Sequence, residues 1–350
     1  MKIDYWRSKF GNFGDDLNGW LWGEILPGLW DPNDGIRFIG IGTVIDQKLD
    51  TSAFTVIFGS GAGYGTPPKT LGNTGLRKIY CVRGPLTAKT LGLAPQLALT
   101  DPAILLADIE RFQKLERNGV IFVPHWNSVS LGQWPKICRA ADIDFVDPRQ
   151  DSEIVIRKIG SSSLVLAESM HAAIIADALR VPWIPVATSL EFLPFKWADW
   201  SLSLGLDFHT YLLSPSSVQE VIRNLLLLLS QGRGTFTSVS FSNDVPAKVN
   251  FSDEGALFND VKQVYHRHTQ RWRYFYTRIA DAVIGKLLKT SHQFGPYQYK
   301  RALKQMLILR GMPGRLSNDE RHLETIKAVR AKLDEMRDDY RSGTLGRRSA

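Results

Sequence analysis

A serine and a histidine, Ser169 and His171, stand where an apolar run typical of a buried strand, residues 164–167, is followed by apolar residues at helical spacing in 169–179. The first amide groups of a helix have no partner inside the helix, and the positive end of its dipole favours anions. The carboxyl edge of a parallel sheet is also where such folds bind ligands. The pattern therefore predicts a small-anion site, with the alternative that Ser169 only caps the helix and His171 only packs.

Three basic side chains are further candidates for anion contacts. Arg83 directly follows an expected strand, 78–82, and its planar guanidinium suits a carboxylate or a phosphate. His125 ends another expected strand, and Lys196 lies between two aromatic residues in an expected loop. Each also has an ordinary explanation: a surface arginine, a structural histidine, and a lysine whose stem covers apolar surface.

Two loops offer an acid–base group and a permissive backbone. The segment 12–17 contains Asp15 and Asp16, either of which could take a proton from a hydroxyl or cap the helix that begins there. The glycines at 59, 61, 63 and 65 allow close approach of the backbone to a ligand, or form a tight turn. Their spacing does not complete the dinucleotide-binding fingerprint, and the sequence has no Gly-Lys-Ser/Thr phosphate loop, Gly-x-Ser-x-Gly elbow or His-Glu-x-x-His motif. No metal is indicated.

The elements that must position these residues alternate between strand and helix twice along the chain. The expected strands are 2–6, 36–41, 55–58 and 78–82 in residues 1–115, and 119–125, 143–146, 164–167 and 181–186 in residues 116–235. Helices are expected at 85–91, 108–117, 151–159 and 169–179. This order predicts βαβ units with mainly parallel sheets, and hence two Rossmann-like domains that face each other across a cleft.

Residues 236–350 are expected to form a basic helical extension. The 350-residue chain has a net charge of +8, and residues 240–350 carry 21 Lys and Arg against 12 Asp and Glu. Helical patterns cover 270–289 and 317–340, the latter capped by Ser317 or Asn318. The basic, aromatic-rich segment 262–310 suits an anionic membrane surface, unless its apolar stripe packs against the core. No nucleic-acid-binding module accompanies it, so nucleic acid is not an expected partner.

The compartment follows from simple features. The two cysteines, Cys81 and Cys138, have no metal-ligand spacing and indicate a reducing environment. The N-terminus lacks a signal-peptide pattern, and no apolar run reaches the about 20 residues that span a bilayer. We expect a cytoplasmic protein, with peripheral attachment to the inner face of the cytoplasmic membrane as a further expectation for the basic extension.

Taken together and in order, these residues resemble the polysaccharide pyruvyl transferase family, and look most like bacterial exopolysaccharide pyruvyltransferases of the succinoglycan kind. The resemblance covers residues 1–210. The matching pieces are Asn12-Phe-Gly-Asp15, the glycines at 59–63, Arg83-Gly-Pro-Leu-Thr87, Asp101-Pro102-Ala103, Pro124-His125, Ser169-Met-His171-Ala, Val181-Pro182, and Lys196 with Leu204-Gly205-Leu206 after it.

The resemblance implies a GT-B-like α/β fold with no cofactor. It also implies phosphoenolpyruvate as the donor substrate, a lipid-linked oligosaccharide as the acceptor, and a pyruvate ketal on a sugar as the product. Within it His171 is expected to act as general acid or phosphate contact, and Asp15 as base toward the acceptor hydroxyl. The remaining expected site residues are Arg83, Lys196, Ser169 and His125 around the donor, and Asn12, Gly14, Gly59 and Gly61 in the backbone loops of the acceptor side.

Two other functions remain open. Two facing Rossmann-like domains would equally suit a GT-B glycosyltransferase that uses a nucleotide sugar, with Glu168 binding the ribose. A non-catalytic, membrane-associated organiser of polysaccharide assembly would use the basic extension as its working part. Donor binding separates the two enzymes, and a catalytically silent protein that still binds membranes or partner enzymes would support the organiser.

Overall fold

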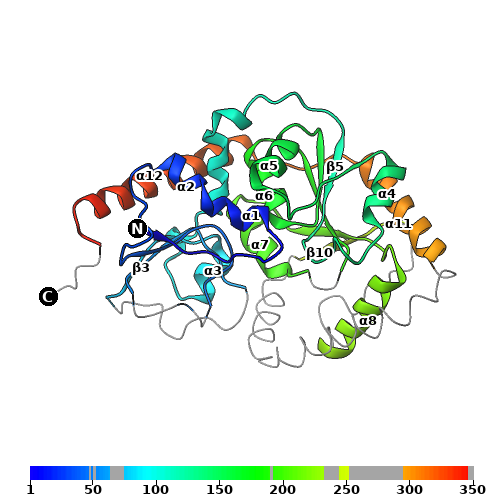
Figure 1. Cartoon of the computed structure of the whole chain (residues 1–350), viewed down its shortest axis with the longest axis horizontal. Coiled ribbons are helices and arrows are strands. Elements are labelled where there is room, and N and C mark those ends of the chain that lie inside the picture. Colours follow the sequence, from blue (N-terminus) through cyan, green and yellow to red (C-terminus); the bar gives the residue numbers. More distant parts are fainter. Residues whose placement is uncertain are drawn as a thin grey trace.

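The chain folds around two separate β-sheets that lie side by side and are covered by helices (Figure 1). The computed structural model describes residues 1–46, 49, 53–63, 75–189, 192–231, 244–251 and 295–345. The first unit is built on a four-stranded sheet and the second unit on a six-stranded sheet. All strand pairs are parallel except one at the edge of the second sheet, so the expected α/β class with mainly parallel sheets is confirmed.

The first sheet has the strand order β1-β2-β3-β4. Its interior strand β3 is buried at all four residues, as expected for a parallel strand covered on both faces. Aromatic rings fill the core beside it, with Trp22 in edge-to-face contact with Phe38 and Phe58 at 4.8 and 5.9 Å between centroids. The elements of this unit are β1 (Lys2–Ile3), α1 (Phe13–Asp16), α2 (Leu21–Ile25), β2 (Arg37–Ile39), β3 (Thr55–Phe58), β4 (Arg77–Cys81), α3 (Pro85–Thr90) and the 3-10 helices η3 (Pro102–Asp108) and η4 (Glu110–Phe112).

The second sheet has the order β10-β9-β8-β7-β5-β6, with β10 antiparallel to β9. Helix α6 is buried at all nine residues because it packs between β7 and β8 of this sheet and η3 of the first unit. The elements are β5 (Val120–Val123), α4 (Trp134–Ala141), β6 (Asp144–Phe145), α5 (Ser152–Gly160), β7 (Leu164–Ala167), α6 (Met170–Ala178), β8 (Trp183–Ala187), α7 (Pro194–Ser203), β9 (His209–Leu212), α8 (Val218–Gln231) and β10 (Ala247–Asn250).

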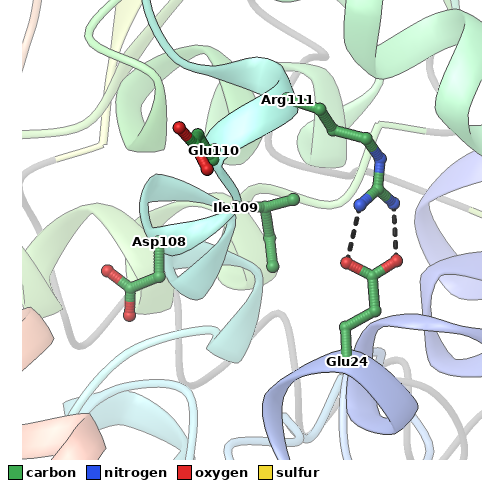
Figure 2. A pocket seen from close by; sticks show the side chains of 5 residues that line it. All are labelled: Glu24, Asp108, Ile109, Glu110 and Arg111. Carbon is green, nitrogen blue, oxygen red and sulfur yellow. Dashed lines mark hydrogen bonds and ion pairs between the residues drawn. The ribbon is translucent and has the colours of Figure 1, made fainter.

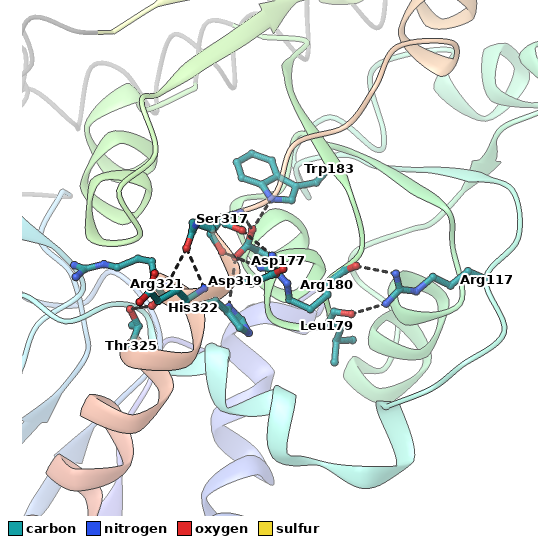
Figure 3. A network of polar contacts seen from close by, with 12 residues as sticks. Arg117, Asp177, Leu179, Arg180, Trp183, Ser317, Asp319, Arg321, His322 and Thr325 are labelled. Carbon is teal, nitrogen blue, oxygen red and sulfur yellow. Dashed lines mark hydrogen bonds and ion pairs between the residues drawn. The ribbon is translucent and has the colours of Figure 1, made fainter.

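The C-terminal helices join the two units. Helix α11 (Gly295–Arg310) packs against α4, whereas α12 (Asp319–Arg341) returns to β4 and η3 of the first unit. The start of α12 is held by the buried carboxylate of Asp177, which accepts hydrogen bonds from the Ser317 backbone N–H at 2.8 Å and from Trp183 Nε1 at 3.1 Å (Figure 3). Asn318 caps α12, as one of the two expected capping residues.

Three local expectations are wrong. The charged segment 108–117 is not an α-helix, because Ile109 is extended and Lys114 has a positive φ of 53°, so only the short η4 forms there. Lys196 lies not in a loop but in α7, where Pro194 occupies the favoured first turn of the helix. Neither Asp15 nor Asp16 is the capping residue of α1: Asn12 holds that position.

Part of the expected extension lies outside the described residues. The helix expected at 270–289 and most of the segment 262–310 fall there, so the membrane-surface expectation stays a prediction. Within the described ranges, no helix is both long enough and apolar enough to cross a bilayer.

Candidate active site between the two units

Helix α1 of the first unit lies against the start of α6 in the second unit. A Cβ atom added at Gly14 would lie 2.0 Å from Nδ1 and 2.2 Å from Cγ of His171, so only a glycine allows this approach. The Phe13 backbone N–H also donates to the Pro148 carbonyl of the second unit at 2.9 Å. The expected residues Gly14 and His171, far apart in the sequence, therefore meet at the contact between the units.

His171 faces the carboxylate of Asp101, and one oxygen of that carboxylate accepts no hydrogen bond from the described residues. Its Nε2 lies 3.9 Å from Oδ2 of Asp101, and within the described part of the chain neither buried atom has a hydrogen-bond partner. Burial, with the charges of Lys196 and Arg83, lowers the pKa of His171 to about 3. Burial also raises the pKa of Asp101 to about 6. Two buried polar atoms that face each other without a hydrogen bond are rare, and such a pair in a folded protein calls for an explanation.

Asp15 projects from α1 toward the same region. Its half-buried carboxylate accepts a hydrogen bond from the side-chain amide of Asn12. Burial raises the pKa of Asp15 to about 7; the charge of Lys196 opposes this rise and that of Asp101 adds to it. A carboxyl with a pKa near neutrality exchanges protons at physiological pH, which is the property of a general base or acid.

Arg83 is completely buried and holds several partners. Its Nε donates to Asp199 Oδ2 at 3.3 Å. Its Nη1 donates to Thr43 Oγ1 at 2.7 Å, and its Nη2 donates to the Ala62 carbonyl at 3.0 Å. A Cβ at Gly61 would lie 2.2 Å from the guanidinium carbon, so the glycine loop packs directly on the arginine. Arg83 thus supplies a fixed positive charge beside His171, while its hydrogen bonds hold protein groups.

Lys196 and His125 belong to the second unit. The positive charge of Lys196 lowers the pKa of His125, His171 and Asp15 alike. Its stem also approaches Gly63 of the first unit, where an added Cβ would lie 3.0 Å from Lys196 Cγ. Burial, with the charges of Lys196 and Arg223, lowers the pKa of His125 to about 3, so this histidine is neutral at pH 7.

Ser169 and Gly59 have different surroundings. Ser169 stands at the N-cap position of α6, but its side chain accepts no capping hydrogen bond from the first residues of this helix. The alternative that Ser169 merely caps the helix is therefore not supported. Gly59 has a φ of +78° and packs against Pro102, where an added Cβ would lie 2.2 Å from the ring. Gly59 thus shapes the loop and positions Asp101, next to Pro102.

Two buried carboxylates were not expected as site residues. Asp101 lies in the Asp-Pro-Ala sequence that resembles the family. An aspartate before a proline is typical of a helix cap, and this was the signal in the sequence. Its Oδ1 accepts a hydrogen bond from the Ala103 N–H at 3.0 Å. Asp199 lies inside α7 and accepts from Arg83 and from Thr87 across the unit boundary. No local pattern marks Asp199, because its partners lie more than a hundred residues away in the sequence.

A surface depression elsewhere is not part of this site. It is lined by Glu24, Asp108, Ile109, Glu110 and Arg111, none of which is a candidate residue (Figure 2). The guanidinium of Arg111 makes paired hydrogen bonds of 2.6 and 2.7 Å to Glu24, which joins α2 to η4. This depression is therefore a junction between elements, not a ligand pocket beside His171.

The two units thus bring cations, a neutral histidine and a near-neutral carboxyl together between two mainly parallel sheets, an arrangement typical of enzyme active sites. Residues 55–189 match the family described as polysaccharide pyruvyl transferase. The chain is also 48% identical over 210 residues to the succinoglycan biosynthesis protein ExoV of Rhizobium meliloti (strain 1021). That alignment covers 59% of this chain and 66% of ExoV, just under two thirds of the relative. These matches show that the chain is similar to polysaccharide pyruvyl transferases and to a protein of succinoglycan biosynthesis.

Proposed function

We propose that this protein transfers pyruvate from phosphoenolpyruvate to a sugar of an exopolysaccharide repeat unit and releases phosphate. The observation that carries the proposal is the meeting of Asp15, with a pKa near 7, and His171, with a buried unpaired Nε2, next to the charge of Lys196. We also propose that the two units form a GT-B-like arrangement. In it residues 1–115 would serve the acceptor and residues 116–235 the donor.

Phosphoenolpyruvate suits the charges of the second unit. The donor carries a phosphate and a carboxylate, and the positive end of the α6 dipole lies beside Ser169 and His171. Lys196 supplies a positive charge that acts on His125, which brings a second imidazole to the same region. Arg83 acts through its fixed charge, because its hydrogen bonds already hold Asp199, Thr43 and Ala62.

The proposed reaction moves three protons, forms two carbon–oxygen bonds to the sugar and breaks the carbon–oxygen bond to phosphate. His171 donates a proton to the methylene carbon of the donor, which becomes a methyl group and leaves the central carbon electron-poor. A first sugar hydroxyl attacks that carbon while Asp15 accepts its proton. A second hydroxyl then attacks, the carbon–oxygen bond to phosphate breaks, and phosphate leaves with the second proton. The product is a pyruvate ketal on the sugar.

His171 must first gain the proton that it donates. Because burial and neighbouring cations lower its pKa to about 3, the imidazole is neutral at pH 7 in the ligand-free protein. The negative charges of the donor favour the protonated form and raise that pKa. Donor binding should therefore take up close to one proton per protein at pH 7, and the affinity should fall as the pH rises.

Calorimetric titration with phosphoenolpyruvate tests this proposal. We expect binding at pH 7 whose heat depends on the ionisation enthalpy of the buffer, with the sign of proton uptake, and a reduced uptake in His171→Gln. UDP- and GDP-sugars, titrated as controls, should not bind. Tight binding of a nucleotide sugar without binding of phosphoenolpyruvate would contradict the proposal.

The geometry around Glu168 disfavours the nucleotide-sugar alternative. Its Oε2 accepts from the His125 backbone N–H at 2.8 Å, and its Oε1 accepts from the Thr188 N–H at 3.0 Å and from the Thr188 hydroxyl. Both oxygens thus join the ends of neighbouring strands. A ribose could contact this carboxylate only by displacing bonds that hold the sheet edge together.

A further inference from the structure

Two exposed aromatic side chains project from the segment between β1 and α1. Trp6 is 45% exposed and Phe10 is 68% exposed, which is unusual for rings of this size. The ring of Trp6 lies 6.0 Å from that of Trp126 in the second unit, at an interplanar angle of 41°. One aromatic side chain from each unit therefore meets at the surface.

This aromatic pair borders the candidate active site. Trp126 directly follows His125, whose ring lies 5.7 Å away. Phe10 stands two residues before Asn12, whose amide donates to Asp15. Trp126 thus adjoins the expected donor residue His125, and Phe10 directly precedes the loop whose Asn12 holds Asp15.

The segment is fixed in place next to the second unit. Gly11 has a φ of +85°, and an added Cβ there would lie 2.3 Å from the Arg149 carbonyl oxygen. The Phe13 N–H bond to Pro148 holds the next turn. Because the backbone of this segment is fixed, it holds the side chains of Trp6 and Phe10 at the surface.

We propose that Trp6, Phe10 and Trp126 form an aromatic platform that binds the sugar rings of the glycan acceptor beside the sugar that receives pyruvate. A pyranose has C–H groups on its faces and hydroxyls at its edge, so a flat indole can cover the face while the edge stays solvated. The inference rests on the proposed function, since it assigns the substrate class of the same site.

A protein partner fits the same surface less well. A stable protein interface needs about 800 Å² on each side, which is more than these three rings cover. A glycan chain needs only a narrow strip of rings that leads to the reacting hydroxyls. Nearby Tyr5 is not part of the strip, because the Arg7 guanidinium lies 4.8 Å above its ring.

Saturation-transfer NMR on the full chain tests the platform, with neutral β-linked gluco- and galacto-tetrasaccharides as probes. We expect at least one probe to bind the unaltered protein, with the strongest transfer to C–H protons of one sugar face. Trp6→Ala and Trp126→Ala should each weaken that binding about tenfold, and Trp6→Phe should retain most of it. Tyr297→Ala, at another exposed aromatic residue on α11, should not change it.

The result separates this inference from the proposed function. Calorimetric binding of phosphoenolpyruvate should be equal in all four variants, which also shows that each is folded. If no probe binds the unaltered protein, or if both tryptophan-to-alanine variants bind as it does, the platform is wrong. If a probe binds but phosphoenolpyruvate does not, the glycan platform stands and the pyruvyl-transfer proposal fails.

Discussion

Replacing Asp15 by asparagine is expected to lower kcat by about 10²–10⁴-fold, because the variant cannot accept the proton of the attacking hydroxyl. The unaltered enzyme should show a rate that rises with pH and levels off above about 7, where the Asp15 carboxyl is ionised. This limb should disappear in Asp15→Asn. Initial rates measured between pH 5 and 9 check both points.

The same variant should be more stable than the unaltered protein at pH 8. Folding raises the pKa of Asp15 from 3.8 to about 7. The contribution of this carboxyl to the free energy of unfolding is therefore complete below pH 3.8 and is lost as the pH rises through 7. Removing the charge should restore about 1–3 kcal/mol at pH 8, after allowance for the partial exposure of the carboxyl. Asp16→Asn is the matched control: its carboxylate accepts from the Asn12 backbone N–H at 3.0 Å, so it should lose a little stability and keep its rate. Equal rates in both variants would remove Asp15 from the mechanism.

Replacing Gly14 by alanine should lower activity about 10²-fold or more, although residue 14 supplies no reacting group. The added Cβ would lie 2.0 Å from His171 Nδ1, so either the imidazole or α1 with Asp15 must move. A displacement of that size misaligns the proton donor with the proton acceptor. Overpacking should also cost about 1–3 kcal/mol of stability. Turnover and denaturant unfolding on the same samples measure the two losses.

Gly23→Ala provides the control for Gly14→Ala. Gly23 lies in α2 of the same unit, and no described atom stands within 4 Å of an added Cβ. Its replacement should leave activity unchanged and stabilise the helix by about 0.5–1 kcal/mol. In a His171→Ala background, Gly14→Ala should cost less stability than in the unaltered protein, because the ring it meets is gone. An active Gly14→Ala enzyme would mean that α1 and α6 need not lie this close during turnover.

The sequence predicted the second unit most closely. The apolar run 164–167 and the helical spacing after it correspond to β7 and α6, because a fully buried strand and a fully buried helix leave strong, local apolar patterns. The charged segment 108–117 misled for the opposite reason. Its Arg111 and Asp108 form ion pairs with Glu24 and Arg330, contacts between distant segments that helical charge spacing cannot reveal.

The candidate site was predictable in its members but not in their partners. Motif order pointed to Asp15, Arg83 and His171 as one group. It could not show that Arg83 is buried against Asp199, or that His171 faces Asp101 across 3.9 Å, because both pairs depend on how the two units dock. Docking also sets the chemistry, since the low pKa of His171 arises from burial and from cations on both units.

The most direct test of the account is turnover with a defined acceptor. The full chain would be incubated with phosphoenolpyruvate and the unpyruvylated oligosaccharide repeat unit of an exopolysaccharide, and released phosphate would be measured together with the mass of the glycan. We expect one phosphate for each pyruvate attached, no release without the acceptor, and loss of both signals in Asp15→Asn. Transfer of a sugar from a nucleotide donor, with no phosphate released from phosphoenolpyruvate, would contradict it.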